Sequence, residues 1–256
     1  MTSTSWKRLP GYAAAGILAV ALISCDSDNV TVVEEGEQGE ELKAFLEAPP
    51  KSSSSGAHRQ NDPHAELSAD KLAQVALQHL DESRPQLAME ALNSALGRFP
   101  GNAMLLSLRA SLLLQQQQTS LALADLNRAV EINPHDPILL TNRAQALRQF
   151  DRNDDAIRDL DSAIELDPDF IGAHFNRGSL RFEAEQYDLA LADFNRCIEL
   201  QPDVPAPYFN RASTWEALGK RDKAISDLER FLSLKPEESW AQVARDLLTQ
   251  WDPDQS

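Results

Sequence analysis

The sequence is short of the residues that define several large classes of protein. It contains 2 cysteines among 256 residues, too few for a disulfide framework. It has 24 basic against 40 acidic side chains, and a surface with that excess of negative charge repels the phosphate backbone of nucleic acids. No apolar run approaches the roughly 20 residues that a membrane-spanning helix requires. Nucleic acid is therefore not an expected partner, and a spanning helix is not expected.

Sequence motifs for catalysis and metal binding are also missing. The five histidines show no metal-ligand spacing, and no P-loop, nucleophile elbow or dinucleotide fingerprint occurs. The stretch DRNDD, residues 151–155, begins like a calcium loop, but Ala156 stands where that loop needs glycine and Ser162 where it needs glutamate. We interpret Cys197 as a buried packing thiol, in preference to a redox group. We therefore expect no enzymatic activity, no cofactor and no metal site.

The first 24 residues have the pattern of a secretory signal peptide. A basic pair at residues 7–8 is followed by an apolar run, residues 13–23, which is too short to cross a bilayer. The four residues LISC, 22–25, resemble the lipobox of bacterial lipoproteins. This resemblance implies that residues 1–24 are cleaved off, that the Cys25 thiol carries a diacylglyceryl group, and that the new amine is acylated. The alternative is an ordinary signal peptide with an incidental cysteine.

The same resemblance implies a location in the bacterial cell envelope. Several acyl chains make a stable anchor, because each buried methylene contributes about 0.8 kcal/mol. Asp26, after the cysteine, resembles the signal that retains lipoproteins in the inner membrane of enteric bacteria, a rule that varies between bacteria. We therefore expect a lipid anchor facing the periplasm, with the inner membrane favoured over the outer.

Residues 25–68 are expected to connect the lipid to a folded domain. The segment is acidic and then rich in serine, proline and turn-forming residues, a composition that buries too little apolar surface to fold alone. A short helix at residues 40–47 is the one element that its pattern suggests. About 40 flexible residues would span roughly 35 Å.

From Ala69 onward the sequence repeats every 34 residues. Prolines recur at this interval: Pro100, Pro134, Pro168, Pro202 and Pro236. Counting back from them gives five units: 69–102, 103–136, 137–170, 171–204 and 205–238. In every unit position 20 is alanine and position 8 is alanine or glycine, which lets two helices approach closely, while position 24 is large and apolar. The proline at position 32 ends the second helix of each unit.

This pattern resembles the tetratricopeptide repeat (TPR), whose 34-residue unit is two antiparallel helices. The resemblance implies an all-α fold, a right-handed α-solenoid of about five TPR hairpins over residues 69–238. Residues 237–251 predict one more helix, with Trp240, Val243, Leu247 and Trp251 on one side. A capping helix at 239–251 is the favoured interpretation, and docking of a partner or a second copy on its aromatic side is the alternative.

Asparagine occupies position 6 of three units, as Asn142, Asn176 and Asn210. On a wheel at 100° per residue, position 6 lies opposite positions 4, 8 and 11, which face the core of the unit. In TPR superhelices that outer face lines a concave groove. The row of amides resembles the asparagine ladder with which O-linked N-acetylglucosamine transferase grips peptide main chain, since an amide is both donor and acceptor. Surface polarity repeated through duplication is the other interpretation.

The predicted groove residues include the neighbours of these asparagines along the same stripe, together with two phenylalanines. They are Asn142, Gln145, Gln149, Phe175, Asn176, Ser179, Phe209, Asn210 and Ser213. None of them is basic, although Arg148 and Arg181 lie near the edges. The TPR proteins that clamp a terminal carboxylate use Lys or Arg for it, so carboxylate capture is not expected.

Four arginines at position 7 each precede an aspartate at position 23 by 16 residues. The pairs are Arg109 and Asp125, Arg143 and Asp159, Arg177 and Asp193, and Arg211 and Asp227. Because the two positions lie on different helices, we predict structural ion pairs. The spacing leaves open whether they form within a unit or between neighbouring units.

These features together predict a lipid-anchored TPR adaptor that is not an enzyme. Known TPR lipoproteins serve cell-wall hydrolases, pilus assembly or outer-membrane machinery, and the resemblance implies that range. The expected partner is a protein or peptide of the cell envelope, bound as an extended segment in the groove. The alternative is a structural protein that self-associates as a homo-oligomer, without a client peptide.

Overall fold

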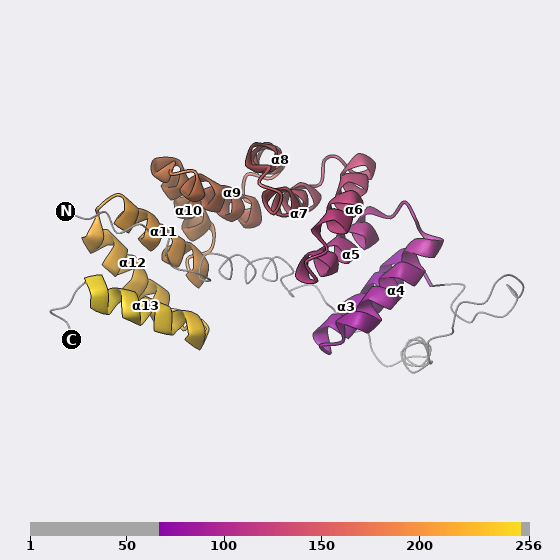
Figure 1. Ribbon diagram of the computed structural model, residues 1–256, viewed down its shortest axis with the longest axis horizontal. Coiled ribbons are helices and arrows are strands. Elements are labelled where there is room, and N and C mark those ends of the chain that lie inside the picture. Colours follow the sequence, from indigo (N-terminus) through magenta and orange to yellow (C-terminus); the bar gives the residue numbers. More distant parts are fainter. Residues whose placement is uncertain (1–66, 252–256) are drawn as a thin grey trace, which may run out of the picture. The chain divides into compact units, whose positions relative to one another are not determined.

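The computed structural model describes residues 67–251. The predicted signal peptide, Cys25 and nearly all of the predicted tether lie outside the described residues. Between residues 67 and 251 the chain forms eleven helices, α3 to α13, and no strand (Figure 1). The fold is therefore all-α, as predicted.

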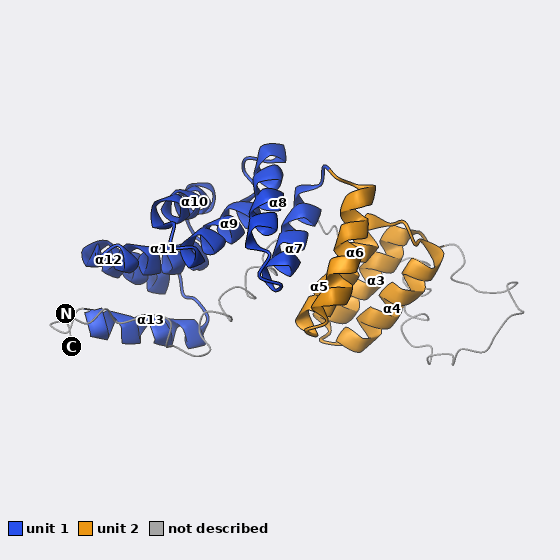
Figure 2. Ribbon diagram, turned by 45° about the horizontal axis from the view of Figure 1, so that its top comes forward, with its two compact units in different colours: residues 1–26, 135–256 blue, residues 27–134 orange. Residues whose placement is uncertain are grey.

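The described residues fall into two compact units (Figure 2). The N-terminal unit comprises described residues 67–134, and its helices are α3 (Ala69–Asp81), α4 (Pro85–Arg98), α5 (Ala103–Gln115) and α6 (Thr119–Ile132). The C-terminal unit comprises described residues 135–251, and its helices are α7 (Pro137–Arg148), α8 (Asn153–Leu166), α9 (Ile171–Glu183), α10 (Tyr187–Leu200), α11 (Pro205–Ala217), α12 (Arg221–Ser233) and α13 (Glu238–Trp251). Every 34-residue repeat thus contains two helices, and α13 follows the last pair.

The turn between the two helices of each repeat uses a left-handed residue at position 15. These residues have φ between 56° and 71° and are Ser83, Gln117, Asp151, Glu185 and Gly219. In the fourth repeat the amide of Gln186 donates to the carbonyl of Arg181 at 2.8 Å, which is the closing bond of a Schellman motif. Only the fifth repeat has the glycine that accepts this conformation without strain. The turn is therefore imposed by packing in the other four.

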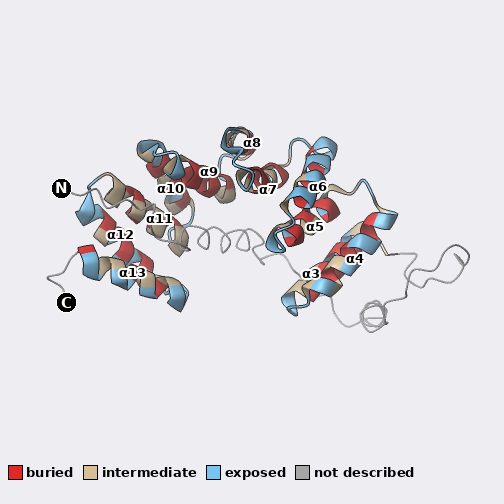
Figure 3. Cartoon of the chain, in the orientation of Figure 1, coloured by how far each residue is buried: buried red, intermediate tan, exposed pale blue. Residues whose placement is uncertain are grey.

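The core of each hairpin lies where the small residues predicted it. Positions 8, 20 and 24 are buried in every repeat, and Figure 3 shows the buried segments of the helices in red. The fourth repeat departs from the others, because it has Gly178 at position 8 and Phe194 at position 24. A Cβ atom on residue 178 would lie only 2.8 Å from the Phe194 ring. The larger ring thus requires the smaller residue.

Helix α13 covers the last hairpin. Trp251 is buried in a cluster that also contains Leu228 and Phe231 of α12, with Trp240 packed at its border. The Trp240 ring meets Phe209 edge-on, with ring centroids 5.4 Å apart. These contacts bury the apolar side of α13 that the sequence indicates, so the helix closes this end of the C-terminal unit.

Candidate peptide-binding face

The candidate site lies on the first helices of the repeats in the C-terminal unit. Helix α7 packs against α9, and α9 packs against α11, in addition to the contacts that each makes with its own second helix. The second helices α8, α10 and α12 make no comparable contact with one another. Because the first helices approach each other more closely, they occupy the inner side of the curved stack. Position 6 was predicted to lie on the face of these helices that points away from the core of their own repeat.

One direct contact shows how the polar stripe is arranged. The Asn210 amide on α11 donates to the Ser179 hydroxyl on α9 across 3.4 Å. Position 6 of the fifth repeat thus faces position 9 of the fourth, which the helical wheel had placed on the same side. The Ser179 hydroxyl in turn donates to the carbonyl of Phe175 at 3.0 Å, and Ser213 makes the equivalent bond to Phe209. The stripe is continuous from α9 to α11.

The predicted groove residues differ in how far solvent reaches them. Gln149 is exposed, whereas Asn142, Gln145, Asn210 and Ser213 are half-buried. Asn176 is 8% exposed and Ser179 is 6% exposed, so the middle of the stripe is its most enclosed part. Whether these side chains bind a partner remains a prediction.

Of the two phenylalanines in the predicted set, Phe175 does not line this face, and that part of the prediction is wrong. Phe175 is 1% exposed and packs against Phe194, with ring centroids 5.9 Å apart. The Phe209 ring is half-buried between Phe231, at 5.2 Å, and the capping residue Trp240. Position 5 lies 100° from position 6 on the helix, and its rings pack against the second helix of the repeat and, for Phe209, against α13.

The four predicted ion pairs are present within their repeats. The Nε atoms of Arg109 and Arg143 lie 2.7 Å from the carboxylates of Asp125 and Asp159. The Nη2 atoms of Arg177 and Arg211 lie 2.7 Å from the carboxylates of Asp193 and Asp227.

Three of these arginines also reach the preceding repeat. Arg109 Nη1 donates to Asn93 at 2.9 Å, and Arg211 Nη1 donates to Asn195 at 2.7 Å. Arg177 Nη1 donates to Asp161 at 2.7 Å. All three acceptors occupy position 25, which is polar in every repeat. The four predicted pairs therefore form within a repeat, while the contacts to the preceding repeat go to position 25, a structural position that sequence reasoning missed. Its regular Asn or Asp in four units was the available signal.

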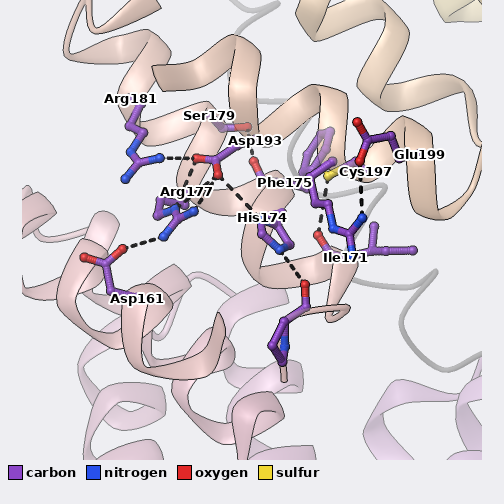
Figure 4. A network of polar contacts seen from close by, with 12 residues as sticks. Asp161, Ile171, His174, Phe175, Arg177, Ser179, Arg181, Asp193, Cys197 and Glu199 are labelled. Carbon is purple, nitrogen blue, oxygen red and sulfur yellow. Dashed lines mark hydrogen bonds and ion pairs between the residues drawn. The ribbon is translucent and has the colours of Figure 1, made fainter. Parts of the chain in front are cut away.

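The fourth repeat gathers further charged groups around Asp193, which is 2% exposed (Figure 4). Its carboxylate accepts hydrogen bonds from Arg177 and from Arg181 Nη1, the latter at 2.8 Å. His174 Nδ1 lies 3.5 Å from the same carboxylate, and its Nε2 lies 2.9 Å from the carbonyl oxygen of Pro168. Burial alone would raise the pKa of Asp193, but hydrogen bonds from His174 and Arg177, and the charges of both arginines, lower it below its ordinary value.

The two arginines at the edges of the stripe are both engaged. Arg181 is held by Asp193, and Arg148 forms a two-pronged ion pair with Glu183, in which Nε and Oε2 are 3.2 Å apart. The pair connects α7 to α9. Each guanidinium would therefore have to break its internal ion pair before it could bind a carboxylate of a ligand.

The described residues contain no arrangement suited to a metal or a membrane span. In residues 67–251, no group of three or more His, Cys, Asp or Glu side chains is placed to bind a metal ion. Within the same residues, none of the helices is both long and apolar enough to traverse a bilayer.

Several solved structures share the arrangement of helices. PilW, described as a widely conserved type IV pilus biogenesis factor, has a TM-score of 0.62 and 21% identity, and the match covers 65% of this chain and 77% of PilW. TTC0263, described as a thermophilic TPR protein in Thermus thermophilus, has a TM-score of 0.60 and 19% identity, with 72% and 98% of the two chains covered. YrrB, described as a TPR protein with an unusual peptide-binding site, has a TM-score of 0.53 and 18% identity, with 72% and 95% covered.

Sequence comparison agrees with these likenesses. No curated protein sequence matches the chain significantly. Two sequence profiles that are both described as tetratricopeptide repeat do match it, one at residues 76–137 and 141–205 and the other at residues 182–249. Together they cover most of the chain and nearly all of the helices described above. The chain therefore belongs to the tetratricopeptide repeat family.

Proposed function

We propose that this protein is a non-catalytic adaptor, held in the bacterial cell envelope by a lipid on Cys25, that binds an extended protein segment along the first helices of its C-terminal unit. The observation that carries the proposal is the polar stripe across α9 and α11, in which Asn210 meets Ser179. Concave faces of helical solenoids commonly bind partner proteins.

The chemistry of the stripe favours main-chain recognition. Amides and hydroxyls such as Asn176 and Ser213 supply both donors and acceptors, which match the alternating C=O and N–H groups of an extended chain. The nearby cations Arg148 and Arg181 are neutralised by Glu183 and Asp193. An uncharged stretch of polypeptide therefore fits this face better than a terminal carboxylate does. The description of YrrB as a TPR protein with an unusual peptide-binding site supports the proposal that the ligand is a peptide.

The binding function is tested with a random twelve-residue peptide library selected on the full chain. Wild-type protein should enrich a set of peptides, and the triple variant Asn142→Ala, Asn176→Ala, Asn210→Ala should lose them while unfolding near the wild-type temperature. A matched variant with the exposed second-helix changes Ser162→Ala and Ser226→Ala should keep them. If the triple variant binds the enriched peptides with unchanged affinity, the asparagines are not part of the binding site.

The lipid anchor is tested separately, because it does not depend on the groove. We propose attachment at Cys25, with the domain facing the periplasm from the inner membrane, on the strength of the LISC stretch and the following Asp26. Cells fed labelled palmitate should label the wild-type protein and not the Cys25→Ala variant. Label that persists in the variant would overturn the anchor and leave the adaptor proposal standing.

A further inference from the structure

The three asparagines of the stripe have different hydrogen-bonding situations. The Asn210 amide is engaged by Ser179, and Asn142 also has an interaction partner. Among the described residues, the Asn176 side chain forms no hydrogen bond, although Asn176 is the most enclosed of the three at 8% exposed. Enclosed polar groups nearly always have a partner, because losing hydration without gaining a bond costs free energy. The side-chain amide of Asn176 therefore has donors and an acceptor that a bound polypeptide can use.

The Asn176 amide is enclosed without being sealed. The side-chain polar atoms that are both fully buried and unpartnered in the described residues are His79 Nδ1 and Thr141 Oγ1. The amide of Asn176 is not among them, so solvent still reaches it. Because solvent reaches the amide, a ligand that lies on this face of α9 can also contact it.

The residues that share the face of α9 with Asn176 are small. Gly172 lies one turn before it and Ser179 one turn after it, whereas the corresponding residues of the third repeat are Ile138 and Gln145. At residue 172 a Cβ atom would lie 3.4 Å from the Phe170 ring and 4.0 Å from Thr141, in ordinary van der Waals contact, so the glycine adds no side chain of its own to this face. A polypeptide backbone can thus approach α9 at this point more closely than it can approach α7.

We propose that the asparagines are not equivalent rungs, and that Asn176 is the anchoring contact, which binds the C=O and N–H of one peptide unit in the partner segment. The partner segment carries glycine, alanine or serine at that unit, because a larger side chain would hold its backbone away from the amide of a residue that is only 8% exposed. This inference rests on the proposed function and specifies the class of ligand: an extended, uncharged segment with a small residue at its centre.

The test compares single substitutions in the full chain, with peptides enriched on wild-type protein from the random twelve-residue library as the probe. Asn176→Ala should weaken the dissociation constant by about tenfold or more, in the range of a binding hot spot, and Asn142→Ala and Asn210→Ala should weaken it by less than about threefold. The thermal midpoint of Asn176→Ala should equal or exceed that of wild type, because the substitution removes an unpartnered enclosed amide. A merely structural asparagine would lower it.

A second variant tests the space beside the amide. Gly172→Ala should also weaken binding, while Gly97→Ala, on a helix of the N-terminal unit where a Cβ atom meets nothing within 4 Å, should leave it unchanged. In the enriched peptides one position should hold glycine, alanine or serine, and leucine placed there should weaken binding to wild-type protein.

The results separate failure of the Asn176 anchor from failure of the proposed function. Equal losses for the three asparagine variants, a lowered thermal midpoint for Asn176→Ala, or peptides with large residues at every position would overturn the anchor and leave the proposed function intact. A library that yields no peptide binding to wild-type protein would overturn the proposed function, and the anchor with it.

Discussion

The ring of Phe194 occupies the space that Gly178 leaves empty on the facing helix. A Cβ atom on residue 178 would lie 2.8 Å from Cε1 of that ring, closer than a real carbon contact. In the other four repeats, alanine at position 8 faces leucine at position 24. The fourth repeat has thus exchanged a smaller residue on one helix for a larger one on the other, so that total volume is roughly kept.

This exchange predicts strong coupling between the two positions. Gly178→Ala should lower the free energy of unfolding by about 1–3 kcal/mol through overpacking, although alanine is the better helix former. The double variant Gly178→Ala, Phe194→Leu restores the pair found in the other repeats and should recover most of the loss. Urea denaturation of the two single variants and the double variant measures the coupling. Simple addition of the two single effects would contradict the packing relationship.

Arg177 is expected to contribute far more to stability than a surface arginine on the next helix. It links Asp193 of its own repeat to Asp161 of the preceding one, and its removal leaves a carboxylate that is almost inaccessible to solvent short of a partner. Arg177→Ala should therefore cost about 3 kcal/mol in the free energy of unfolding. Arg196→Ala, whose partners Asp169 and Glu199 are exposed, should leave it almost unchanged. Comparable losses in urea denaturation would argue against the role of Arg177.

The ionised carboxylate of Asp193 is expected to stabilise the fold at neutral pH and to lose this contribution in acid. Burial acts to raise its carboxyl pKa in the folded protein, but hydrogen bonds from His174 and Arg177 and the charges of Arg177 and Arg181 outweigh burial, so the pKa is lowered. A lowered folded pKa means that the contribution is complete above the unfolded value, near 3.9, and is lost as pH falls through the folded value.

Asp193→Asn removes that contribution at every pH. The variant should be less stable than wild type at pH 7, and the difference should shrink as pH falls below about 4. The exposed change Asp169→Asn is the control and should leave the pH profile of thermal unfolding nearly parallel to that of wild type. A difference between Asp193→Asn and wild type that stays constant down to pH 2 would contradict the assignment.

Cys197 is predicted to be unreactive until the fourth repeat unfolds. Burial, the largest cause, and the charge of Asp193 raise the pKa of its thiol to about 12, so almost no thiolate exists at pH 8. In a Cys25→Ser variant, Cys197 is the remaining thiol, and iodoacetamide should modify it at least about a thousandfold more slowly in buffer than in 8 M urea. Similar rates in the two conditions would show that the core cluster of Phe175, Ala190, Phe194 and Cys197 is open in solution.

Much of the hairpin architecture follows from particular positions in the sequence. Alanines such as Ala156 and Ala190 mark the close approach of two helices, and the prolines at position 32 mark the ends of the second helices, because these local requirements recur in every repeat. Turn residues such as Asp151 and Glu185 had no such signal. They adopt positive φ without being glycine, since the packing of the two helices imposes the conformation.

The sequence predicted which positions of the first helices share a face, but not which residues at that face are buried or what else they contact. The wheel predicts that positions 6 and 9 share one face, and the contact between Asn210 and Ser179 confirms it. The assignment of Phe175 to the same face was wrong, because position 5 lies 100° from position 6 and the Phe175 ring packs against Phe194. The extra partners of Asp193 were also out of reach, because Arg181 and His174 occupy positions that are apolar or aromatic in most other repeats.

By itself, the sequence determined the repeat length and the all-helical hairpin, and it marked Arg177 and Asp193 as ion-pairing residues, because each of these depends on a spacing that recurs from unit to unit. Only the tertiary structure decided that Arg177 also holds Asp161, that Phe175 is in the core, and that Asn176 is enclosed without an internal partner. These properties arise where neighbouring repeats meet. The distance and angle between repeats depend on the packing of every side chain in the contact, which a 34-residue period does not specify.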